Sequence, residues 1–144
     1  AAPGPLRFRR YRDLSVVHLV VTPLQPSSLL PAALEQNPDG VLLELYGVGT
    51  GPVDQVGLLE GVIAAREAGI PVVAVSSSRQ AVVDLSRYEV GQMFAELGVI
   101  SGRDMTAEAA ATKLAHLLSL NLDYVQLCRA IGTDQRGELT RRSP

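Results

Sequence analysis

Four short and almost continuous apolar runs divide the chain. They are rich in Val, Leu and Ile, and a run of this length without polar alternation is typical of a strand that is buried on both faces of a sheet. The predicted strands cover residues 15–22, 40–46, 71–76 and 98–101. The pattern therefore indicates a sheet whose two faces are both covered.

Residues with helical spacing lie between and after these runs. The predicted helices cover residues 28–36, 53–68, 88–97, 106–120 and 122–131. In the second helix, we expect Val56, Leu59, Ile63 and Ala64 to share the buried face. In the fourth, alanine and leucine recur at the spacing of one helix face, and Thr106 is a natural cap for the N-terminus.

The alternation of strand and helix predicts the fold class. Such an order is typical of a parallel sheet with right-handed crossovers. We expect residues 15–140 to form a small three-layer α/β domain, with a four-stranded parallel sheet flanked by helices. We expect residues 1–14 to be a linker or arm that enters this domain, and residues 141–144 to be a tail.

The loop after the second strand is the first candidate for a site, because ligands of such sheets bind beyond the carboxyl ends of the strands. Residues 47–52 of this loop have the sequence GVGTGP. Alternating glycines permit positive φ and the close approach of a ligand or another backbone, and Pro52 suits the first turn of a helix. A dinucleotide site is weakly supported, because the spacing differs from GxGxxG and no acidic residue ends the next strand. An ordinary tight turn is the alternative.

A polar cluster ends the third strand. It consists of Ser76, Ser77, Ser78 and Arg79. Hydroxyl groups and a guanidinium can bind a carboxylate or phosphate. The three serines are therefore candidate ligand-binding residues, and a solvated loop is the alternative.

Other reactive residue types give no indication of catalysis. His18 lies within an apolar run and is expected to be partnered or half-buried, and His116 has no second metal ligand at helical spacing. Cys128 falls on an apolar stripe and is expected in the core. We find no nucleophile elbow and no HExxH motif. We therefore expect no catalytic residue, no metal site and no cofactor in this chain.

Composition narrows the setting. Hydrophobic residues make up 47% and aromatic residues 4% of the 144 residues, so the core must be aliphatic. The formal net charge of −2 gives no reason to expect a nucleic-acid partner, and no apolar run is long enough to cross a membrane. The single cysteine excludes an internal disulfide and fits a reducing compartment, so we expect a cytoplasmic protein.

Four stretches resemble one protein family. Residues 45–52 are similar to its sequence Ser-Tyr-Gly-Val-Gly-Asn-Ala-Pro, and residues 88–100 to its Tyr-x-x-Gly, helix and Gly-Val-Ile. The more specific matches are GRDMTAE at residues 102–108, followed by TKL at 112–114, and RGELT at residues 136–140. In this order, they make the chain resemble the C-terminal domain of type I, cytoplasmic bacterial L-asparaginases.

The resemblance implies a supporting role in amide hydrolysis. The family hydrolyses L-asparagine to L-aspartate and ammonia, with threonine nucleophiles, an aspartate and a lysine on a larger N-terminal domain whose motifs are absent here. Its C-terminal domain packs across an intimate dimer, and the glycine loop reaches the neighbouring subunit's active site. By this resemblance Gly47, Gly49, Thr50 and Gly51 form that loop, with Thr50 in place of the family's Asn. The implied partners are the missing N-terminal domain and further copies in a homodimer or homotetramer.

The resemblance does not extend to a second site of the family. Some type I members bind asparagine at a regulatory site, where an Arg and a Cys correspond to Glu44 and, approximately, to Ser78. A carboxylate in place of the Arg would repel the carboxylate of the ligand, which argues against this regulation.

Two other functions stay open from the sequence. One is a small-ligand-binding regulatory module that uses the loops at Thr50 and at Ser76 to Ser78. The other is the asparaginase-like subunit of a tRNA-dependent amidotransferase, which has the same type of domain.

Overall fold

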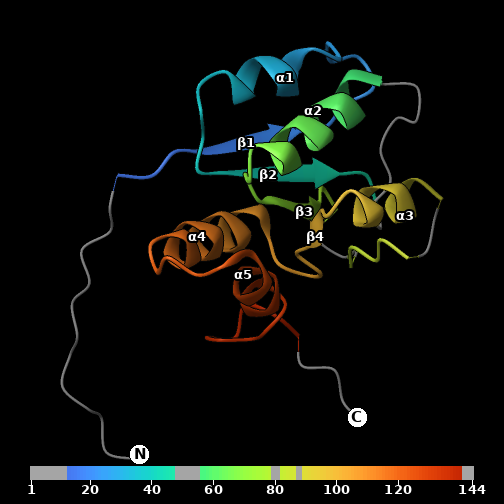
Figure 1. Cartoon of the computed structure of the whole chain (residues 1–144). Coiled ribbons are helices and arrows are strands. Elements are labelled where there is room, and N and C mark those ends of the chain that lie inside the picture. The colour runs from blue at the N-terminus through green and yellow to red at the C-terminus, as the bar shows by residue number, and fades with distance from the viewer. Residues whose placement is uncertain (1–12, 48–55, 79–81, 87–88, 141–144) are drawn as a thin grey trace, which may run out of the picture.

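The computed structural model describes residues 13–47, 56–78, 82–86 and 89–140 (Figure 1). Its strands are β1 (Val16–Val20), β2 (Gly40–Leu45), β3 (Val72–Ser76) and β4 (Ile100–Ser101). Its helices are α1 (Leu29–Leu34), α2 (Val56–Glu67), α3 (Glu89–Glu96), α4 (Ala107–Leu118) and α5 (Tyr124–Ile131). Every predicted strand and helix is present, although most are shorter than expected at their ends. Most of the predicted arm and all of the predicted tail lie outside the described residues, so the proposed domain limits stay a prediction.

The sheet follows the order of the chain. Its strands are arranged β1-β2-β3-β4, and all neighbouring strands are parallel. Connections of one hand that step in one direction place their helices on one face of a sheet. Accordingly, α1, α2 and α3 share one core with the sheet, whereas α4 and α5, which follow the last strand, cover the other face (Figure 1). The predicted three-layer α/β fold is therefore confirmed.

The central strands supply both cores. Leu43 and Ala74 face α1, α2 and α3, whereas Leu42 and Val73 face α4 and α5, and all four side chains are 0% exposed. Successive residues of a strand point to opposite faces. Because helices cover both faces here, each of these positions must be apolar, which explains why the strands lack polar alternation.

The expected buried face of α2 is wrong for Ile63 and Ala64, which are exposed, whereas Leu59 is half-buried against the core, as expected. Leu58, Val62 and Ala65 are buried, whereas Ile63 is 40% exposed. The buried face also contains Gly57 and Gly61, where α1 and the residues before it come close. An added Cβ at Gly61 would lie 2.7 Å from Cγ of Leu30. Glycine adds nothing to a hydrophobic pattern, so the pattern could not identify a face that is defined by close helix packing.

Replacing Gly61 with alanine is expected to lower the free energy of unfolding by up to about 2 kcal/mol. Overpacking against Leu30 costs about 1–3 kcal/mol, which exceeds the roughly 1 kcal/mol that alanine gains from helix propensity. Urea denaturation monitored by circular dichroism measures the difference. Ala64→Gly, on the exposed side of the same helix, is the control and should cost about 1 kcal/mol from propensity alone. A stabilised Gly61→Ala variant would contradict the packing argument.

Candidate functional site

Two of the loops that were predicted to carry a site meet at the carboxyl edge of the sheet. Ser76, the last residue of β3, is 8% exposed, and its hydroxyl donates a hydrogen bond to the carbonyl of Gly47, just after β2. The same hydroxyl accepts a bond of 2.9 Å from the backbone N–H of Ser78. Gly47 has a φ of 46°, in the region that favours glycine. Ser76 therefore fixes the base of the glycine loop, and Gly49, Thr50 and Gly51 lie outside the described residues.

A cavity of about 160 Å³ opens beside this contact. Its lining comes from the ends of β2 and β3 and from the start of α4, and consists of Glu44, Ser76, Ser77, Ser78, Asp104, Met105, Thr106, Ala107 and Glu108. Ser77 and Ser78 are exposed, whereas the hydroxyl of Ser76 makes the internal bonds just described. The structure thus brings the three candidate serines to one cavity. The hydroxyl of Ser76, however, already bonds the backbone of Gly47 and Ser78. The role of the three serines in ligand binding stays a prediction.

Carboxylates dominate the charge of this cavity. Its lining includes Glu44, Asp104 and Glu108. Glu44 is hydrogen-bonded to exposed His18, with 3.1 Å between Oε2 and Nε2, so His18 is partnered, as expected, but not half-buried. Burial raises the pKa of Asp104, but hydrogen bonds from Thr140 and the charge of Arg103 outweigh burial and lower the pKa below its ordinary value. Such a cavity disfavours the carboxylate of an amino acid.

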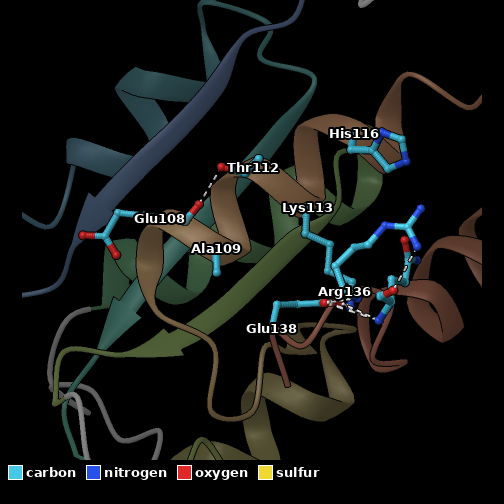
Figure 2. A pocket seen from close by; sticks show the side chains of 8 residues that line it. Glu108, Ala109, Thr112, Lys113, His116, Arg136 and Glu138 are labelled. Carbon is cyan, nitrogen blue, oxygen red and sulfur yellow. Dashed lines mark hydrogen bonds and ion pairs between the residues drawn. The ribbon is translucent and has the colours of Figure 1, made fainter. Parts of the chain in front are cut away.

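A second and larger cavity lies between α4 and the segment that follows α5 (Figure 2). It has a volume of about 560 Å³, and its lining consists of Glu108, Ala109, Thr112, Lys113, His116, Gln135, Arg136 and Glu138. Figure 2 shows Lys113 extending from α4 toward Glu138. In the sequence, Lys113 and Glu138 stand out only as members of the matching motifs TKL and RGELT. The sequence signal that could have identified Lys113 is its position as a charged residue within the alanine and leucine stripe of the predicted helix 106–120.

Lys113 uses all three of its ammonium donors inside the protein. The residue is only 7% exposed, and its Nζ lies 2.8 Å from the carbonyl of Ile131, 2.6 Å from that of Thr133 and 2.6 Å from Oε1 of Glu138. An ammonium group has three N–H donors. Lys113 is therefore a structural cation rather than a ligand-binding group.

Glu138 closes this arrangement from the other side. Its carboxylate accepts bonds from the backbone N–H groups of Arg136 at 2.7 Å and Gln135 at 3.0 Å. Burial raises the pKa of Glu138, but the bonds from Lys113 and the backbone outweigh burial and lower the pKa to about 2. The Glu138 carboxylate therefore stays ionised across the physiological pH range.

The remaining reactive side chains offer no competing site. Cys128 is half-buried rather than fully buried, and burial raises the pKa of its thiol, which makes it a weaker nucleophile at neutral pH. Among the described residues, no group of three or more His, Cys, Asp and Glu side chains could hold a metal ion. No helix in the described part of the chain is long and apolar enough to cross a membrane.

The fold is a small α/β domain with a four-stranded parallel sheet and a cavity at the carboxyl edge of that sheet. Residues 15–131 match the family described as the glutaminase/asparaginase C-terminal domain. The chain therefore belongs to this family.

Individual relatives support this assignment. The chain is 41% identical over 130 residues to an L-asparaginase of Thermococcus kodakarensis, a match that covers 89% of this chain and 38% of that protein. A solved structure of L-asparaginase I from Vibrio cholerae superposes with a TM-score of 0.84 at 32% identity, covering 96% of this chain and 41% of that one. A more distant relative, at 30% identity over 115 residues, is one subunit of the glutamyl-tRNA(Gln) amidotransferase of Methanobrevibacter smithii, with 80% of this chain and 26% of that protein covered. The chain thus spans well under half of the length of each.

The Glu138 carboxylate is expected to make stability depend on acid pH. Its folded-state pKa of about 2 lies below the ordinary 4.5, so its stabilisation is complete above pH 4.5 and is lost as the pH falls toward 2. Thermal melts from pH 6 to pH 2 should show a fall in Tm over this window. Glu138→Gln should have a lower Tm at pH 6 and a shallower fall, whereas Glu60→Gln, on α2 far from Lys113, should follow the wild type. Parallel curves for wild type and Glu138→Gln would contradict this assignment.

Proposed function

We propose that this chain is the C-terminal domain of an L-asparagine amidohydrolase, in which it supports dimerisation and completes the active site of the neighbouring subunit. The observation that carries this proposal is the family match over residues 15–131, together with 41% identity to a protein named L-asparaginase. The chain covers 38% of that relative, which leaves a larger part to hold the catalytic threonines, as the resemblance implies. The reaction converts asparagine and water to aspartate and ammonia.

The geometry at the carboxyl edge supports a role in positioning. The bond from Ser76 to Gly47 ties the base of the glycine loop to β3, and the positive φ of Gly47 turns the chain away from the direction of β2. A loop that is held at its base loses less freedom when it contacts a partner, so more of the contact energy remains as binding energy. In this proposal Thr50 offers its hydroxyl to the active site of the partner subunit, in place of the Asn of the family.

The surroundings follow from the same proposal. The partners are an N-terminal asparaginase domain and identical subunits in a homodimer or homotetramer, and the substrate is L-asparagine. The chemistry described by the resemblance needs no cofactor. The location is the cytoplasm, which the single cysteine of the chain supports.

An amidotransferase component is the second candidate. The 30% identity to one subunit of a glutamyl-tRNA(Gln) amidotransferase supports it, although the identity to an L-asparaginase is higher. A regulatory ligand-binding module is the third, and the cavity beside Ser77 and Ser78 supports it. An asparaginase requires free asparagine as substrate, whereas the amidotransferase requires charged tRNA to accept the ammonia. The two substrates therefore distinguish the enzymes.

The 144-residue chain alone is expected to release no ammonia from asparagine, because the catalytic groups belong to the other domain.

Residues 15–140 are expected to restore asparaginase activity when they replace the matching part of the Thermococcus kodakarensis enzyme. The measurement is ammonia release from asparagine and from glutamine by the purified chimera. The truncated enzyme without a C-terminal domain is the control. A folded, dimeric chimera without activity would contradict the proposed function.

Within that chimera, Thr50→Ala is expected to lower kcat/KM by about 2- to 10-fold. This is the loss of one hydrogen bond, worth about 0.5–1.5 kcal/mol. Thr50→Ser keeps the hydroxyl and should retain most of the activity, so it is the matched control. Steady-state kinetics and melting temperatures are measured for all three proteins. Equal kcat/KM for Thr50→Ala and wild type would show that the Thr50 hydroxyl makes no contact that matters for catalysis.

A further inference from the structure

We propose that Lys113 and Glu138 are positioning residues for the cavity at the carboxyl edge of the sheet. They act through residues 132–140, here named the strap, which follows α5 and returns to the turn formed by residues 101–105. That turn leads into α4 and forms one wall of the cavity. The structural part of this inference is independent of the proposed function, and only its kinetic consequence depends on asparaginase activity.

The near end of the strap is anchored on α4 by Lys113. The ammonium group donates to the carbonyl of Ile131, the last residue of α5, to that of Thr133, at the start of the strap, and to the carboxylate of Glu138, near its end. Lys113 is 7% exposed with the strap in place, so loss of the Glu138 carboxylate would leave a buried cation without its ion-pair partner. Such a state is strongly unfavourable, because one member of a buried ion pair costs much more alone than in the pair.

The far end of the strap is fixed to the turn. The side chain of Leu139 is 4% exposed in the core under α4 and α5. The next residue, Thr140, donates its backbone N–H to Oδ2 of Asp104 at 2.9 Å. Arg103 reaches both ends of the strap, since its guanidinium lies 3.4 Å from the carbonyl of Gly132 and 3.4 Å from that of Thr140. The turn therefore contacts the strap at its first and last residues.

The backbone of Arg103 has an unusual conformation. Its φ is 56°, in the left-handed region that residues with a Cβ rarely adopt. Glycine would adopt this conformation at a lower cost. The two carbonyl bonds of the guanidinium give arginine a compensating interaction at this position, which glycine cannot make. The conformation of the turn and its attachment to the strap thus depend on the same residue.

Hydrogen bonds connect the turn to the residues at the carboxyl edge of the sheet. The backbone N–H of Val83 donates to the carbonyl of Arg103 at 2.9 Å, and the hydroxyl of Ser101 donates to the carbonyl of Val83 at 2.7 Å. Gly102 donates its N–H to the carbonyl of Ala74 on β3 at 2.7 Å. One turn therefore holds β3, the segment around Val83 and the carboxylate of Asp104 in place. Release of the strap removes a bond from Asp104 and loosens this wall of the cavity.

Amide hydrogen exchange on the 144-residue chain tests the structural part. Two variants release the strap at opposite ends, namely Lys113→Met and Arg103→Gly, and the second also removes the unfavourable φ. We expect exchange of the amides of Val83 and Met105 to accelerate at least tenfold more than that of Ala65 in α2, on the opposite face of the sheet. Arg136→Gln is the matched control. The side chain of Arg136 lines the second cavity, and its guanidinium donates to the carbonyl of the neighbouring Gln135.

Two results would overturn the inference. One is acceleration by the same factor at Val83, Met105 and Ala65, which would make the strap an ordinary part of a cooperative core. The other is unchanged exchange at Val83 and Met105 in a folded Arg103→Gly variant. If Lys113→Met does not fold, Glu138→Gln takes its place and the same two results decide, because the amide keeps nearly the shape of the carboxylate but loses the charge that pairs with Lys113.

The kinetic consequence is tested in the chimera with the Thermococcus kodakarensis enzyme. Arg103→Gly is expected to raise KM about threefold or more while kcat stays within twofold, because the wall of the site moves and the catalytic groups lie on the other domain. A fall in kcat with unchanged KM would contradict a positioning role. An inactive wild-type chimera would count against the proposed function, while the exchange experiment would still decide the role of the strap.

Discussion

The direction in which the sheet grows is the constraint on which the rest of this structure depends. The four parallel strands follow one another in chain order, so the connecting helices α1, α2 and α3 all lie on one face. In the part of the chain that the structure describes, the other face of the sheet is covered by residues that come after β4. This arrangement makes α4, α5 and the strap an essential half of the core, although they follow the completed sheet in sequence.

The buried ion pair between Lys113 and Glu138 is a consequence of that arrangement. A segment that returns across the end of two helices without forming a helix or strand leaves backbone carbonyls without regular partners, and these groups are costly to bury unpaired. The ammonium group of Lys113 supplies donors to two of them and to Glu138. The three partners of the Lys113 ammonium therefore both stabilise the fold and fix the position of the strap. Burying the charge is favourable only when all three are in place.

The same arrangement shapes the carboxyl edge. Its cavity receives Glu44 from β2, the serines at the end of β3 and Asp104 from the turn before α4, so the sheet and the layer that follows it both contribute to it. Three acidic side chains, Glu44, Asp104 and Glu108, line it, and the pKa of Asp104 lies below its ordinary value. An acidic edge is a poor independent site for an amino acid, and it fits a domain that supports a neighbouring active site better than one that binds substrate alone.

The sequence by itself determined the fold class, the order of the elements and the family. Continuous apolar runs identify doubly covered strands, and the motifs at residues 102–108 and 136–140 are specific. It did not determine the buried face of α2, because Gly57 and Gly61 pack closely without adding hydrophobicity. Nor did it show that Ser76 binds Gly47, or that Lys113 binds Glu138. These partners are 29 and 25 residues apart, and they meet only in the folded chain. Local patterns determine which segments form helices and strands, whereas packing between distant segments decides which side chains become buried and which polar groups find partners.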